Sequence, residues 1–241
     1  MADLKSYPVW DASTRWFHWI NALCVIGSAG IGLVIINDAA LGISNAGKIA
    51  LKTLHVWIGY VFLLNLCWRI VWGFIGTRYA RWGRVLPAGA GYWQSLRSYT
   101  SGLASGRPPA YLGHNPLGRI AVTVLLLLLL TQAVTGLLLA GTDIFYPPLG
   151  AWFAHSIAAP GVDPSTLVPY APEMYDKAAY ESMRALRKPF VTVHLYSFYT
   201  LLAMIAVHVA AVVITELREG NGIISAMFTG RKVMTEKPVD E

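Results

Sequence analysis

Four of the six histidines lie inside long apolar stretches of the sequence, namely His18, His55, His194 and His208. An ionisable group inside a membrane is costly, so each of them is by default a candidate functional residue. A single one would often be a neutral imidazole bonded to a neighbouring helix, but four in one chain favour a shared chemical role. His194 and His208 are fourteen residues apart. This interval puts both on one face of a helix, about 21 Å apart along its axis.

Imidazole nitrogens on facing helices are suitable axial ligands for haem iron. If the helices alternate in direction, depth in the membrane pairs His18 with His208 near the inner leaflet and His55 with His194 near the outer one. The pattern therefore predicts two stacked b-type haems. A single zinc ion is disfavoured because ligands about 20 Å apart cannot share it. A proton relay would need acidic partners, which the four stretches lack.

The segments that must position these histidines are long enough to cross a membrane core, which takes about 20 residues. They cover residues 16–36, 53–76, 120–142 and 189–215. We expect Pro189 to begin the last helix, since its missing N–H is harmless there. Hydrophobic residues make up 55% of the 241 residues and charged ones only 13%. The composition argues against a soluble enzyme and predicts an all-α integral membrane four-helix bundle, with residues 1–241 as one domain.

The loops indicate the orientation of these spans. Residues 77–119 contain six arginines and no acidic residue, which by the positive-inside rule places this inner loop and both termini in the cytoplasm. The outer loop, residues 143–188, has nearly balanced charge, which suits protein contacts. Because the net charge of +6 reflects topology, we expect lipid as a partner and no nucleic acid. We predict a multi-pass membrane protein, with a short interfacial helix near residues 92–103.

Several arginines are candidates for balancing the propionates of a haem. Arg15, Arg69 and Arg119 lie at depths that suit the inner haem, between His18 and His208. The positive-inside rule accounts for the same arginines equally well. Their role as propionate partners is therefore an expectation that needs its own test.

Two further histidines lie outside the spans. His114 stands just before the third span and has two interpretations: a hydrogen bond to a propionate or quinone carbonyl, or a capping role with Asn115 and Pro116. We favour capping, because the local sequence is rich in turn formers. His155 lies in the outer loop, where we expect a surface side chain.

Several short motifs occur in order over most of the chain. They are Arg15-Trp16-Phe17-His18-Trp19, the run from His55 to Gly59, the block Arg69, Trp72, Gly76, Arg78, Tyr79 and Arg81, Gly113-His114-Asn115-Pro116, the His194 to His208 interval, and Leu217-Arg218-Glu219. In this order and spacing the chain resembles the b-type cytochrome subunit of membrane-bound nickel-iron hydrogenases, within the bacterial di-haem cytochrome b family. The resemblance implies that the four histidines bind haem. It also implies that the subunit lies in the bacterial inner membrane and passes electrons between a periplasmic partner and the quinone pool.

The segment from Tyr146 to Arg187 departs from the family pattern, being longer and without a shared motif. A hydrogenase small subunit is the leading partner, and a periplasmic c-type cytochrome or another oxidoreductase is the alternative. A stand-alone superoxide:quinone oxidoreductase is a second class, although compact four-helix relatives should not need so long an outer loop. A non-redox assembly or transport subunit is a third. An electron-transfer subunit need not itself be an enzyme, and the sequence leaves that point undecided.

Overall fold

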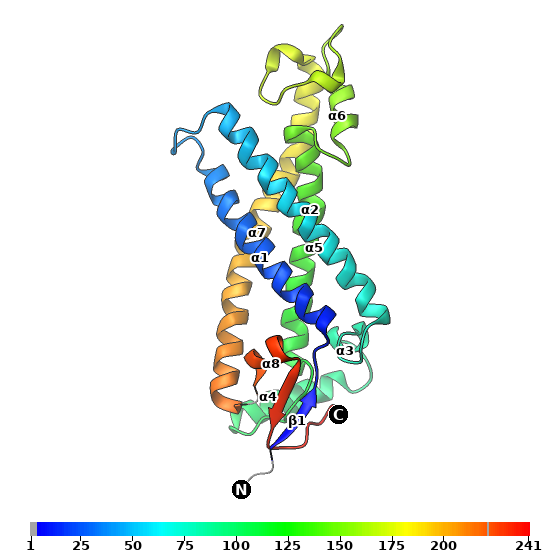
Figure 1. The fold of residues 1–241 in the computed structure, drawn as a ribbon, viewed down its shortest axis with the longest axis vertical. Helices are drawn as coiled ribbons and strands as arrows, with labels where there is room; N and C mark the ends of the chain where they lie inside the picture. Colours follow the sequence, from blue (N-terminus) through cyan, green and yellow to red (C-terminus); the bar gives the residue numbers. More distant parts are fainter. Residues whose placement is uncertain (1–3, 221) are drawn as a thin grey trace. The chain divides into compact units, whose positions relative to one another are not determined.

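The computed structural model describes residues 4–220 and 222–241. Within these residues, four helices are long and apolar enough to cross a membrane. Figure 1 shows them as α1 (Ala12–Ile36), α2 (Asn45–Ile75), α5 (Pro116–Ile144) and α7 (Lys177–Glu219). The predicted all-α membrane fold with four spans is confirmed.

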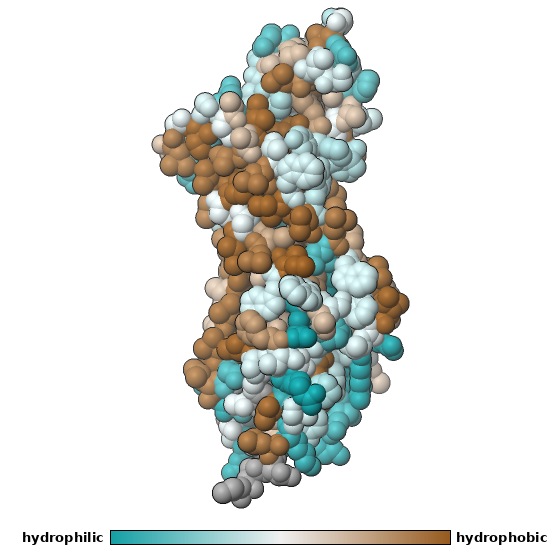
Figure 2. Space-filling model, in the orientation of Figure 1, coloured by the Kyte–Doolittle hydropathy of each residue, from teal (hydrophilic) through white to brown (hydrophobic). Residues whose placement is uncertain are grey.

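The surfaces of these helices are apolar. Leu23 and Ile26 of α1 are each 69% exposed and Leu64 of α2 is 71% exposed. Figure 2 shows hydrophobic side chains over much of the visible surface of α1 and α2, interrupted by paler residues. Exposing so many large apolar side chains to water would be unfavourable, so these faces are suited to lipid.

Two of the helix starts follow from local capping. The Asp11 carboxylate accepts from the Thr14 N–H at 2.7 Å at the start of α1. At α5, Asn115 Oδ1 accepts from the Gly118 N–H at 2.7 Å, and Pro116 follows as the first helical residue. Both arrangements satisfy N–H groups that have no partner within the first turn.

The predicted start of the fourth helix at Pro189 is wrong. Helix α7 begins twelve residues earlier, at Lys177, and Pro189 lies inside it. Asp176 caps this earlier start by accepting from the Ala179 N–H at 2.8 Å. Proline removes one backbone hydrogen bond, but the capped segment before it is rich in helix-forming residues and continues through.

The described chain divides into two compact units. Unit 1 takes in Met1–Ile20, Asn65–Leu127 and Leu201–Glu241, and unit 2 takes in Asn21–Leu64 and Leu128–Thr200. Each long helix contributes one part to each unit. Unit 1 therefore holds His18 and His208, and unit 2 holds His55 and His194.

Unit 1 joins the two ends of the chain. Strand β1 (Lys5–Pro8) pairs antiparallel with β2 (Arg231–Met234), with Lys5 opposite Met234 and Pro8 opposite Arg231 (Figure 1). The short helices of this unit are α3 (Trp82–Val85), α4 (Tyr92–Ala104) and α8 (Ile223–Thr229). Helix α4 confirms the short helix predicted near residues 92–103. The core of the unit consists of Val9, Trp10, Tyr79, Leu112, Ala226 and Met234.

Unit 2 contains the folded form of the loop predicted at residues 143–188. It comprises α6 (Gly150–Ile157), the 3₁₀ turns η1 (Pro164–Thr166) and η2 (Pro172–Met174), and the first turns of α7. A separate apolar core fixes this segment, formed by Phe153, Ala154, Ile157, Leu167, Tyr175 and Met183. The loop is therefore a structured element with its own core.

Candidate functional site

His55 on α2 and His194 on α7 meet in unit 2. Their ring centres are 6.4 Å apart and the ring planes are inclined by 73°. Bonds from a metal to imidazole nitrogen are about 2 Å long, so one ion between two rings would separate their centres by about 6 Å. The spacing of this pair therefore fits a single metal bound on both sides.

A threonine fixes the orientation of one of these rings. Thr135 on α5 is buried, and its Oγ1 lies 2.8 Å from His194 Nδ1. The Thr135 hydroxyl donates to the Thr131 carbonyl at 2.6 Å, so its oxygen is left to accept from an Nδ1–H. With the proton on Nδ1, the Nε2 lone pair of His194 is free for a metal.

Glycines border both rings of this pair. A Cβ at Gly136 would lie 3.5 Å from His194 Cε1, and one at Gly32 would lie 3.7 Å from His55 Cε1. Among the described residues, nothing lies within 4 Å of the Cβ position of Gly59, one turn after His55. Gly27 instead packs against Ile58 in ordinary helix contact. The distances at Gly136 and Gly32 are also of ordinary van der Waals length, so of these four glycines Gly59 is the one that borders open space.

His18 on α1 and His208 on α7 form the second pair, in unit 1. The two imidazoles lie close enough to interact electrostatically. Both side chains are partly buried, and His18 Nδ1 is buried with no hydrogen-bond partner among the described residues. His55 Nδ1 is also buried without a well-aligned partner in that part of the chain, although the Ser28 backbone is nearby. The structure thus offers two pairs of imidazole donors, His55 with His194 in unit 2 and His18 with His208 in unit 1.

Unit 1 also holds two arginines with unused donors. Arg69 is only 5% exposed, donates from Nη2 to the Ala80 carbonyl at 3.0 Å and lies 4.7 Å from the Trp82 ring centre. Its Nη1 is buried without a partner in the described structure, as is Nε of Arg15. Buried guanidinium donors without partners are unfavourable, so both positions suit an anionic ligand such as a haem propionate.

Arg119 is used differently. Its Nε donates to the Leu86 carbonyl at 2.8 Å and its Nη2 to the Ala88 carbonyl at 2.8 Å. The guanidinium also lies 5.0 Å from the Tyr92 ring centre. Arg119 therefore fastens the segment before α4, which accounts for its charge without a propionate.

His114 does not cap the third span, contrary to our expectation. Asn115 provides the cap, whereas the His114 ring packs 4.9 Å from the Trp10 ring. Burial, with the nearby charges of Lys232 and Arg69, lowers the pKa of His114 to about 3 and keeps it neutral. Its Nδ1 is buried without a partner among the described residues. His155 is exposed on α6, as predicted.

The sequence interpretation missed two polar residues of α5. Besides Thr135, Gln132 donates from Nε2 to the His194 carbonyl at 2.9 Å and to Ser197 Oγ at 2.8 Å. The available signal was their position: polar side chains three residues apart in a strongly apolar helix usually have a partner on a neighbouring helix.

Comparison with known proteins identifies the family of the chain. The family model described as prokaryotic cytochrome b561 matches residues 9–230. A probable Ni/Fe-hydrogenase B-type cytochrome subunit of Cupriavidus necator is 32% identical over 127 residues, covering 50% of this chain and 52% of the relative. A probable Ni/Fe-hydrogenase 1 B-type cytochrome subunit of Escherichia coli is 30% identical over 145 residues, covering 56% of this chain and 60% of the relative. One from Rhizobium leguminosarum is 24% identical over 249 residues, covering 98% and 92%.

In the first two alignments the chain spans only 52% and 60% of the length of those relatives. No solved structure matches significantly. The family model covers most of the sequence, including all four candidate ligands. The resemblance to hydrogenase b-type cytochromes is thereby confirmed, and the chain belongs to the prokaryotic cytochrome b561 family.

Proposed function

We propose that the chain binds two b-type haems, one between His55 and His194 and one between His18 and His208. The observation that carries this proposal is the 6.4 Å between the ring centres of His55 and His194, which fits one iron between two imidazoles. A bound haem supplies one-electron redox chemistry, while the chain positions and insulates it. The Thr135 contact and the bordering glycines prepare the first site, and the unpaired donors of Arg15 and Arg69 suit the second.

The function that these sites support is electron transfer across the membrane to or from quinone. Helix α7 carries one ligand of each pair, so a single helix connects the two sites. The relatives are described as probable hydrogenase cytochrome subunits, which supports a hydrogenase small subunit as the redox partner. Exposed apolar side chains on the folded loop of unit 2, Trp152 and Val168 among them, are suited to docking a protein.

The proposed orientation has both termini in the cytoplasm of a bacterial cell. Pairing of β1 with β2 brings the two terminal segments together, which supports an even number of crossings. The arginine-rich residues 77–119 mark the cytoplasmic side by the positive-inside rule. The folded loop of unit 2 then faces the periplasm, where a redox partner would dock.

The decisive experiment is a reduced-minus-oxidised optical spectrum of the purified full chain, with haem quantitation. Two b-type haems per chain are expected. A colourless protein, or one haem in fully loaded material, would contradict the proposal. Mass spectrometry of co-purifying proteins then tests the partner, and isolation with a c-type cytochrome in place of a hydrogenase subunit would reassign it.

A further inference from the structure

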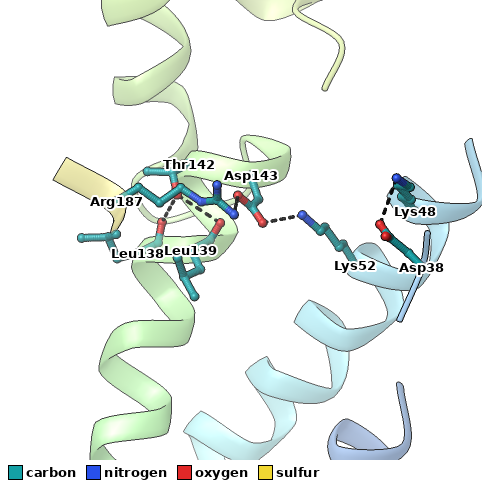
Figure 3. A network of polar contacts seen from close by, with 8 residues as sticks. All are labelled: Asp38, Lys48, Lys52, Leu138, Leu139, Thr142, Asp143 and Arg187. Carbon is teal, nitrogen blue, oxygen red and sulfur yellow. Dashed lines mark hydrogen bonds and ion pairs between the residues drawn. The ribbon is translucent and has the colours of Figure 1, made fainter. Parts of the chain in front are cut away.

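Asp143 joins two cations from neighbouring helices in unit 2. Its Oδ2 lies 2.6 Å from Lys52 Nζ on α2, and its Oδ1 lies 2.5 Å from Arg187 Nη2 on α7. Figure 3 shows the carboxylate of Asp143, at the end of α5, between the two cationic side chains. The side chains of Lys52 and Asp143 are only 16% and 15% exposed, so this ion cluster is largely shielded from water.

The charges of the cluster do not balance. Two cations share one carboxylate, which leaves a net charge of +1 at a shielded position. Arg187 Nε is buried and has no hydrogen-bond partner among the described residues. Lys52 also lies 5.3 Å from the Tyr170 ring centre, which does not supply a negative charge. An excess cation and an unused donor in a poorly solvated site favour a further anion.

The cluster lies next to the His55 and His194 site. Lys52 precedes His55 by three residues, so both are on one side of α2. Arg187 precedes His194 by seven residues, two helical turns that return it to nearly the same face of α7. The Lys52 ammonium is within electrostatic range of the His55 imidazole. The two cations therefore belong to the same side of their helices as the proposed iron ligands.

We propose that Lys52 and Arg187, oriented by Asp143, bind the carboxylate edge of the porphyrin held by His55 and His194. This inference rests on the proposed function and extends it to the propionates of that haem. Asp143 is a positioning residue, because it holds the two cations in place and leaves part of their charge for the ligand. If the cluster only holds α2, α5 and α7 together, changing its charge will not shift the potential of one haem selectively.

The test is a spectroscopic redox titration of the purified full chain. Reduction adds an electron, so losing a nearby cation disfavours it. Lys52→Gln and Arg187→Gln should each lower the midpoint potential of one haem. We expect the equilibrium constant for its reduction to fall about tenfold, which corresponds to about 59 mV for one electron. Asp143→Asn should raise the potential of that same haem. The other haem should stay unchanged in all three variants.

Two ion pairs near the same helix ends provide matched controls. Lys48 pairs with Asp38 at 3.0 Å, one turn before Lys52, and Arg184 pairs with Glu181 at 3.6 Å, one turn before Arg187. Lys48→Gln and Arg184→Gln should leave both potentials unchanged. Equal shifts in these controls, or no shift in the cluster variants, would overturn the inference. Lys52→Arg and Arg187→Lys keep the charge and should retain the wild-type potentials. They provide the test if a glutamine variant does not fold.

A second probe separates direct binding from a distant charge effect. The apoprotein is reconstituted with haem or with haem dimethyl ester, in which both carboxylates are blocked. Lys52→Gln should weaken binding of haem several-fold relative to wild type and leave ester binding equal in the two proteins. Equal weakening for both compounds would refute carboxylate recognition. A wild-type chain that binds no haem would instead refute the proposed function itself.

Discussion

Thr135 Oγ1 lies 2.8 Å from His194 Nδ1 and donates to the Thr131 carbonyl at 2.6 Å, which leaves the Thr135 oxygen as the acceptor for an Nδ1–H. This chain of two hydrogen bonds selects the His194 tautomer with a free Nε2. Thr135 is buried on α5, so the constraint on the imidazole is protected from water. An oriented ligand of this kind binds metal more tightly than one that is free to rotate or change tautomer.

Thr135→Val should therefore weaken haem binding at the His55 and His194 site. The variant keeps the shape of the side chain and removes the acceptor, and outer partners of metal ligands typically contribute about 10–100-fold in affinity. Haem retention during dilution, followed by absorbance, measures the effect. Thr135→Ser should restore retention, because it keeps the hydroxyl.

The control for this prediction is Thr123→Val. Thr123 makes the same type of bond to the carbonyl four residues earlier in α5, that of Arg119 at 2.8 Å. Among the described residues Thr123 makes no hydrogen bond to an imidazole, so haem retention should be that of wild type. Comparable loss in both valine variants would show that helix stability, and not ligand orientation, is the cause.

Single histidine replacements should separate the two haems. His194→Ala should remove about half of the haem and one of two midpoint potentials, and His208→Ala should remove the other half, because each iron loses one axial ligand. Pyridine haemochrome assays and redox titration measure both effects. His155→Ala, an exposed histidine on α6, is the matched control and should retain full haem. Loss of the same potential from both ligand variants would contradict the assignment of pairs.

Arg69→Gln should lower the potential of the haem between His18 and His208. Removing a buried cation makes reduction of the haem less favourable. A tenfold fall in the equilibrium constant for reduction corresponds to about 59 mV. Arg69→Lys keeps the charge and should change the potential less. Arg97→Gln alters an exposed arginine of α4 and should change nothing. An unaltered potential in Arg69→Gln would remove Arg69 from this role.

The four spans could be predicted because length and apolarity are local properties of the sequence. The start of α7 could not, since Pro189 carries a valid start signal that competes with the Asp176 cap thirteen residues before the proline. Choosing between them depends on how the intervening residues pack in the folded loop. The same limit applies to His114, where the adjacent Asn115 took the capping role and left the imidazole buried.

The candidate ligands were visible because histidine is rare and costly in a span. Their supporting contacts were not, because they join residues far apart in the sequence. Thr135 and His194 are 59 residues apart, and Lys52 and Asp143 are 91 apart. The sequence places Asp143 at the start of the outer loop, residues 143–188, whereas in the structure it is a shielded partner of two cations at the end of α5. Only the packing of α2, α5 and α7 within unit 2 brings these groups together.

Lys232 gives a prediction about stability and pH. It lies on β2, is 4% exposed and donates from Nζ to the Tyr111 carbonyl at 3.1 Å. Burial lowers its pKa to about 8, although the charge of Asp240 opposes this effect. An unfolded lysine has a pKa of about 10.4, so between about pH 8 and 10 the unfolded chain binds more protons than the folded one. Stability should therefore rise with pH in this window, by up to about 1.4 kcal/mol per pH unit.

Lys232→Met should be more stable than wild type at pH 7, because it removes a buried charge, and this advantage should shrink as the pH rises from 8 to 10. The measurement is the melting temperature of the purified chain in detergent across pH 7 to 10. Lys237→Met replaces an exposed lysine five residues later and should follow the wild-type profile. A constant difference between Lys232→Met and wild type at every pH would show that packing, and not the charge of Lys232, sets the stability of the paired terminal strands.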